Sequence, residues 1–212
     1  MFSCKKNKTN NNNSINKTSV KVDTPVNNQI KKNYPFQYIK IQPDSTKIDY
    51  KMDSLNISKS IWINNIQIIT CTINDNKNGI HLIVKNNIGK VLFQSKGQQD
   101  SWRYNPNLFK SKESKKIIVI SEIGDEESWG IYIQKYDKGI YKEIGSIDIV
   151  ALNEYDESLN IIPFIKVKEL NNDVLKFYFD KKIRIFDNET EKTFLGKNLN
   201  YKYKNGKIMM TK

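Results

Sequence analysis

The chain has 212 residues, with 35 lysines and arginines against 23 aspartates and glutamates, so its formal net charge is +12 at pH 7. Only Arg103 and Arg184 are arginines, the residue that bidentate recognition of phosphate and guanine favours. Because the lysines are also spread along the whole chain, we expect no nucleic acid as a partner. No run of 18 or more apolar residues occurs, which argues against a membrane-spanning helix.

The first residues carry a short motif. Segment 2–4, Phe-Ser-Cys, places a small residue directly before Cys4, and a tract of Asn, Lys, Ser and Thr begins at Lys5. This start resembles the processing site of bacterial lipoproteins, with Met1 where their leucine lies. The resemblance implies that Cys4 is lipidated and that the protein belongs to the cell envelope. Since Lys5 is not the aspartate that retains enteric lipoproteins at the inner membrane, outer-membrane anchoring facing the periplasm is implied.

The polar tract also predicts the domain organisation. Residues 1–33 hold too little apolar surface to offset the entropy of ordering, so we expect a disordered polar leash. Residues 34–212 are sufficient for a single β-rich globular domain with its own core. Membrane attachment would act through Cys4 and this leash.

From Tyr34 onward the chain is predicted to form strands. Apolar and polar residues alternate in several segments, which is the period of a strand with one buried face. These segments are 36–42, 130–136 and, more loosely, 174–179. The continuous apolar run 117–120 indicates a strand buried on both faces. Asn205-Gly206, between 201–204 and 207–210, favours a type I′ turn and therefore a closing antiparallel hairpin.

Helical periodicity is nearly absent, and the best candidates for single helical turns are 105–109 and 153–159. The predicted fold class is all-β, an antiparallel β-sandwich or open barrel of about 10–12 short strands. A faint repeat offers an alternative. Segments 78–97 and 129–145 are similar at an offset of about 50 residues, and a third hairpin near 174–186 would continue a propeller-like series.

Few residues suit catalysis or metal binding. The cysteines and the single histidine are Cys4, Cys71 and His81, too few for a zinc site. No phosphate loop, nucleophile elbow or metalloprotease motif occurs. Cys71 lies in the apolar segment 68–73 and is expected to be a small buried hydrophobic residue. We therefore expect no catalytic residue, no metal and no cofactor, and an enzyme is the less favoured class.

Negative charge gathers in two predicted loops of this basic chain. The candidate partner-binding residues are Asp125, Glu126, Glu127 and Trp129 in the first loop and Glu154, Asp156 and Glu157 in the second. Loop carboxylates can ligate calcium, act as an acid–base pair, dock a cationic partner or simply keep a loop solvated. Trp129 would supply the buried area of a small interface, and a place in the core is its alternative.

Two functions follow from these features. The first is a membrane-tethered periplasmic binding protein without catalysis, because small β-rich lipoproteins that lack catalytic motifs resemble immunity or inhibitor proteins that capture a partner protein. The second is a glycan-acting hydrolase or glycan-binding protein that uses the loop carboxylates and Trp62, Trp102 and Trp129. A shared acidic surface would favour the first, and a deep cleft holding a carboxylate pair would favour the second.

Overall fold

The structure, a computed structural model, describes residues 33–52, 54–73, 78–187 and 190–211. The chain divides into two units, Met1–Lys32 and Asn33–Lys212, and the described residues belong to the second. The lipidation candidate Cys4 and the expected leash, apart from Asn33, lie outside the described residues. Within the described ranges, no helix is long and apolar enough to cross a membrane.

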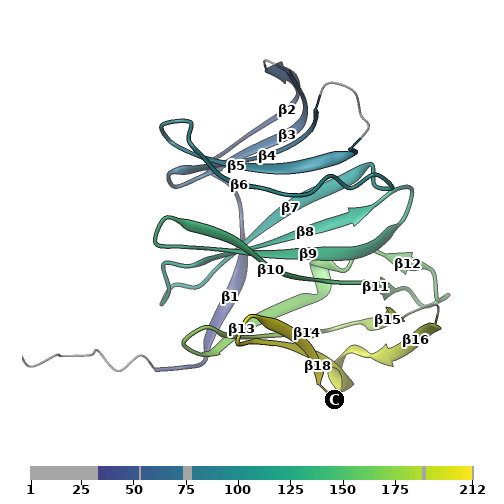
Figure 1. Ribbon diagram of the computed structural model, residues 1–212. Coiled ribbons are helices and arrows are strands. Elements are labelled where there is room, and N and C mark those ends of the chain that lie inside the picture. Colours follow the sequence, from purple (N-terminus) through teal and green to yellow (C-terminus); the bar gives the residue numbers. More distant parts are fainter. Residues whose placement is uncertain (1–32, 53, 74–77, 188–189, 212) are drawn as a thin grey trace, which may run out of the picture. The chain divides into compact units, whose positions relative to one another are not determined.

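The described residues form 18 strands in three sheets, with antiparallel pairing throughout (Figure 1). In spatial order, the nine-stranded sheet contains β10 (Ile140–Ile147), β9 (Ser128–Asp137), β8 (Ile117–Gly124), β7 (Arg103–Lys110), β1 (Phe36–Ile41), β13 (Ile165–Asn171), β14 (Val174–Phe179), β17 (Asn200–Lys204) and β18 (Lys207–Thr211). The five-stranded sheet contains β2 (Ser45–Met52), β3 (Leu55–Ile63), β4 (Ile66–Ile73), β5 (Ile80–Asn86) and β6 (Val91–Gln94). The four-stranded sheet contains β12 (Ser158–Leu159), β11 (Ile149–Leu152), β15 (Lys182–Asp187) and β16 (Thr190–Leu195). Two single-turn 3-10 helices, η1 (Ile162–Phe164) and η2 (Gly196–Asn198), complete the described elements.

The nine-stranded sheet curls until its two edge strands, β10 and β18, come together. The side chain of Ile208 on β18 lies over Gly145 on β10, where an added Cβ would come within 2.7 Å of Ile208 Cδ1. Gly145 also has a φ of +148°, a conformation that favours glycine. The sheet is thus nearly closed and barrel-like. The predicted all-β fold, a sandwich or open barrel, is confirmed.

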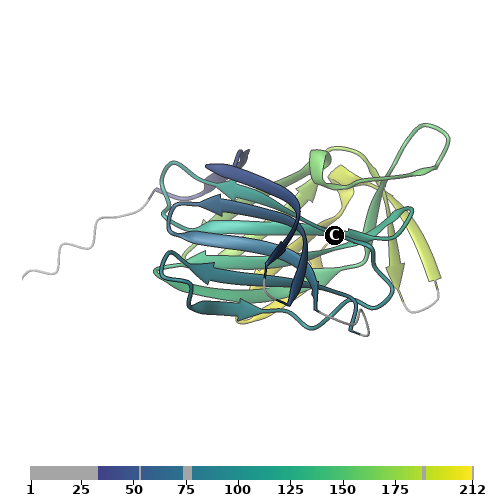
Figure 2. The same cartoon turned by 90° about the horizontal axis from the view of Figure 1, so that it is seen from above.

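Three apolar clusters hold the sheets together. The first lies within the curled nine-stranded sheet and against the four-stranded sheet, and it includes Phe177 and Ile183. The second packs the five-stranded sheet onto the opposite face of β7–β9 through residues such as Ile68 and Val119. The third, around Cys71, lies on the other side of the five-stranded sheet. Figure 2 looks down onto that sheet. β8 therefore contacts apolar layers on both of its faces.

Several expectations from sequence are confirmed. Every residue of β8, which contains the run 117–120, is buried. Asn205 and Gly206 have φ angles of +52° and +80° and join β17 to β18, as expected for the closing hairpin. Cys71 is fully buried, and burial raises the pKa of its thiol to about 11. This thiol is therefore a packing group rather than a nucleophile at neutral pH.

Other expectations are corrected. Segment 105–109 belongs to β7, and Pro106 is tolerated there because β1 pairs with β7 only from Leu108 to Lys110, which leaves an open edge at the proline. Segment 153–159 is a turn followed by β12, not a helical turn. The described strands number 18 rather than about 10–12. β14 and β15 lie in different sheets, so the supposed third hairpin does not exist and the repeat builds no propeller blades.

A largely buried ionic network ties the residue before β8, and β9, to β13, to the turn after β13 and to β1. Lys116 Nζ lies 2.6 Å from Glu169 Oε1 and 3.1 Å from Asp173 Oδ1, and Lys135 Nζ lies 2.6 Å from the same Asp173 oxygen. The Tyr38 hydroxyl donates to Glu169 Oε2 at 2.9 Å. Burial disfavours the charged form of Lys116, but its hydrogen bonds to Glu169 and Asp173 outweigh this and raise its pKa. The network joins strands that are distant in sequence.

Candidate functional site

The two acidic loops predicted from sequence meet at one pocket. It lies where the end of β8 and the start of β9 approach β12, and its volume is about 570 Å³. Its lining residues are Arg103, Asn105, Glu122, Glu126, Glu127, Ser128, Glu157, Ser158, Leu159 and Asn160. Three of the seven candidate partner-binding residues are therefore brought together, namely Glu126, Glu127 and Glu157. We call this site the acidic pocket.

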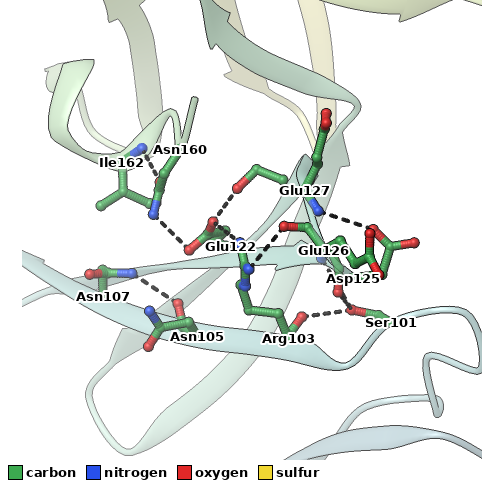
Figure 3. Close-up of polar contacts among 12 residues, drawn as sticks. Ser101, Arg103, Asn105, Asn107, Glu122, Asp125, Glu126, Glu127, Asn160 and Ile162 are labelled. Atoms are coloured by element: carbon green, nitrogen blue, oxygen red, sulfur yellow. Dashed lines mark hydrogen bonds and ion pairs between the residues drawn. The ribbon is translucent and has the colours of Figure 1, made fainter. Parts of the chain in front are cut away.

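Glu122 is the buried carboxylate of the acidic pocket, and its relative exposure is 2%. Figure 3 shows the polar contacts around it. Its Oε1 accepts a hydrogen bond from the Ser128 hydroxyl and lies 3.3 Å from Arg103 Nη1, and its Oε2 accepts from Asn160 Nδ2 at 2.7 Å. Asn160 Oδ1 in turn accepts from the backbone N–H of Ile162 at 2.7 Å. Glu122 thus joins β8 to the segment that leads into η1.

Strand alternation explains why these groups converge. Ile118 and Ile120 of β8 point into the first apolar cluster, and Glu122 continues the same face where that cluster ends. On β7, Asn105 is the cross-strand partner of Glu122 and Arg103 lies two residues away, so both share this face. The sequence shows Glu122 at the start of the first acidic stretch, but neither Glu122 nor Arg103 was among the candidate partner-binding residues. The sequence signal that could have identified Glu122 is its position two residues after Ile120, on the same face of the strand as the buried Ile118 and Ile120.

Both loops are braced by side-chain hydrogen bonds, from their own residues and, in the first loop, also from Arg103 on β7. In the first loop, Asp125 Oδ1 accepts the backbone N–H of Glu127 at 3.2 Å, and Arg103 Nη2 donates to the backbone oxygen of Glu126 at 3.3 Å. In the second loop, Asn153 Nδ2 donates to Glu157 Oε2 at 2.6 Å, and Asn153 Oδ1 accepts the backbone N–H of Glu157 at 2.9 Å. The carboxylate of Glu157 is therefore oriented before any ligand arrives.

Four of the predicted residues do not line the acidic pocket. A bulge at the β8–β9 pairing turns the half-buried Trp129 to the second apolar cluster, away from the carboxylates. Asp125 braces its own loop, as described above. Asp156 forms an ion pair with Lys182 at 2.6 Å, and Glu154 is exposed outside the lining. Trp129 therefore does not share the pocket with the acidic residues.

The acidic pocket carries a local negative charge in a basic protein. Its lining holds four glutamates and one arginine. Glu126, Glu127 and Glu157 are exposed, whereas Glu122 is already engaged by three donors. The lining contains no histidine or cysteine, and in the described part of the chain no three His, Cys, Asp or Glu residues are grouped to hold a metal ion. The arrangement is suited to binding a cationic group through exposed carboxylates.

A second pocket, of about 450 Å³, lies beside an exposed tryptophan. Trp102 has a relative exposure of 80% and lines this pocket together with Asn56, Ser58 and Thr72. A flat ring beside amide and hydroxyl groups can stack on a sugar and hydrogen-bond it. This is the feature of the structure that bears on the glycan alternative.

Comparison with known proteins identifies no relative: no family model matches the chain, and no curated protein and no solved structure matches it significantly. Any statement of function therefore rests on the residues and their geometry.

Proposed function

We propose that the protein is a non-enzymatic binding protein of the cell envelope that captures a basic partner protein at the acidic pocket. The observation that supports this proposal most is that two loops from different parts of the chain present Glu126, Glu127 and Glu157 to one pocket. In a chain of net charge +12, this local reversal of sign would steer a cationic group to one place. Capture without chemistry is the mode of action of immunity and inhibitor proteins.

The proposal is tested by replacing Glu126, Glu127 and Glu157 together with glutamine. Defined probes are tetra-arginine and tetra-lysine peptides, with a neutral tetra-glutamine peptide as the reference, titrated at low and high salt by NMR. Three exposed charge pairs together correspond to about a tenfold change in affinity. We expect the wild type to bind the basic peptides, and the triple variant to bind them about tenfold more weakly with a smaller salt dependence.

The matched control replaces three exposed acidic residues outside the acidic pocket, Asp100→Asn, Glu154→Gln and Glu191→Gln. This control changes the net charge by the same amount as the acidic-pocket variant, and it should leave the affinity for the basic peptides nearly unchanged. Equal losses in the two triple variants would contradict a localised site. The same titration with a neutral oligosaccharide tests the alternative. Binding that Trp102→Ala abolishes, with no binding of basic peptides, would favour a glycan-binding protein.

The second part of the proposal is a lipid tether at Cys4, facing the periplasm from the outer membrane. A leash of roughly 29 residues would have a root-mean-square reach of about 30 Å, enough to hold the domain clear of the head groups. When the gene is expressed with its native upstream sequence, wild-type protein should fractionate with the membrane, and Cys4→Ser should release it to the soluble periplasm. Soluble protein in both cases would contradict the tether.

A further inference from the structure

Three lysines stand side by side on the outer face of the nine-stranded sheet. Lys168 on β13 is the cross-strand partner of Lys176 on β14, and Lys176 is the cross-strand partner of Lys202 on β17. Directly opposite residues of an antiparallel pair have Cβ atoms about 4.5–5.5 Å apart, where like charges repel. We call these residues the lysine row. The neighbouring strands β13, β14 and β18 can be followed in Figure 1.

The direction of these side chains follows from strand alternation. Val167 and Phe177, adjacent in sequence to members of the row, belong to the first apolar cluster inside the sheet. The lysine row therefore faces outward, with its side chains half-buried by neighbouring groups. A further like-charge pair, Lys204 opposite Lys207, extends the positive face to β18.

The charge of the lysine row is not neutralised within the described residues. None of their carboxylates forms an ion pair with Lys168, Lys176 or Lys202. Lys168 Nζ instead lies 5.1 Å from the centre of the Tyr178 ring. Anions from the solvent, or an anionic ligand, would therefore reduce the repulsion between the adjacent ammonium groups.

A pocket of about 350 Å³ adjoins the lysine row. Lys168, Lys176 and Lys197 contribute to its lining, together with Tyr178 and Asn200. Asp180 also lines it, but this carboxylate is paired with Lys166 at 3.2 Å. The pocket therefore brings together three ammonium groups that have no ion-pair partner among the described residues. Beside them lie the Tyr178 hydroxyl, which donates to Gln37 Oε1 at 3.3 Å, and the Asn200 amide, whose Oδ1 accepts from the Thr211 hydroxyl at 2.5 Å.

We propose that the lysine row and this pocket bind phosphate groups of a multiply charged ligand. Lysine ammonium groups bind phosphate as point charges, and a row of them matches an anion that carries several charges. Neither the lysine row nor the pocket lining contains an arginine, which could bind one phosphate in a bidentate geometry. Affinity would therefore depend on the number of negative charges on the ligand. The site is separate from the acidic pocket, which is built on β7, β8, β9 and β12, and it does not depend on the function proposed there.

The test uses the full chain and two kinds of phosphate probe. Sodium tripolyphosphate represents a free ligand and is titrated by calorimetry. Vesicles of phosphatidylcholine with and without phosphatidylglycerol represent lipid head groups and are used in co-sedimentation. The row variant is Lys168→Gln/Lys176→Gln/Lys202→Gln. The control, Lys51→Gln/Lys90→Gln/Lys112→Gln, removes the same charge from exposed positions elsewhere.

We expect the row variant to bind the active probe about tenfold more weakly, and the control to change by no more than about twofold. Binding of tripolyphosphate assigns the site to free phosphates, whereas binding of phosphatidylglycerol vesicles alone assigns it to lipid head groups. Either result supports the proposal. Failure of the wild type to bind both probes, or equal losses in the row variant and the control, would overturn it.

Discussion

Replacing Lys116 with methionine is expected to lower the free energy of unfolding by about 3–5 kcal/mol, the usual effect of removing one partner of a buried ion pair. Glu169 has a relative exposure of 1%, and Lys116 provides its counter-charge at 2.6 Å. Methionine keeps the aliphatic volume but leaves the carboxylate buried without a cation. Total stabilities of about 5–15 kcal/mol are typical, so much of the protein's stability would be lost. Urea unfolding followed by circular dichroism measures the change.

The matched control is Lys115→Met at the exposed neighbouring position, which should change stability by less than about 0.5 kcal/mol. Adding Glu169→Gln to Lys116→Met removes the orphaned charge. The double variant should therefore lose less stability than the sum of the two single variants. Additive losses, or equal effects at positions 115 and 116, would show that the network contributes little.

The same network predicts how the free energy of unfolding changes at acidic pH. The hydrogen bond from Lys135, opposed by partial burial and reinforced by Lys116, lowers the pKa of Asp173 to about 2 from its ordinary value of 3.8. Because this folded-state pKa lies below the ordinary value, ionised Asp173 stabilises the protein above about pH 4, and this contribution is lost as the pH falls through about 2. The side chain is 53% exposed, so solvent reduces the effect. Asp173→Asn should flatten the stability profile in this window.

Replacing Glu122 with alanine is expected to cost about 2–3 kcal/mol, because buried groups that donate to it lose their acceptor. Ser128 and Asn160 would be left without that carboxylate, whereas Arg103 is 40% exposed and can turn to solvent. Asn160 also holds the backbone of Ile162, so the start of η1 should loosen. Hydrogen exchange at the Ile162 amide should accelerate, and thermal unfolding should shift to lower temperature.

Two variants separate this role from surface charge. Glu122→Gln keeps the size of the side chain and one acceptor oxygen. Its free energy of unfolding should therefore lie between that of the wild type and that of Glu122→Ala. Glu127→Gln changes an exposed carboxylate of the same pocket and should leave stability unchanged. If alanine at position 122 leaves both the stability and the Ile162 amide unaffected, Glu122 does not organise the acidic pocket.

Local chemistry in the sequence determined the all-β class and several of its elements. Asn205-Gly206 predicts its turn because both residues tolerate a positive φ. The run 117–120 predicts a strand buried on both faces because none of its four side chains is polar. The two acidic loops are also visible, since carboxylates stand out in a basic chain. These features depend only on neighbouring residues, and their interpretation needs no knowledge of which strands pair.

Strand pairing over long sequence distances was decided only by the tertiary structure. Phe36 pairs with Glu169 because β1 lies between β7 and β13, and this order places the buried network. The lysines look evenly spread in the sequence, yet the register of β13, β14 and β17 puts three of them in one row. Glu122 likewise becomes a site residue only because Asn160, in the segment between β12 and η1, donates a hydrogen bond to it. Alternation fixes which face a side chain occupies, but packing between distant segments fixes what that face meets.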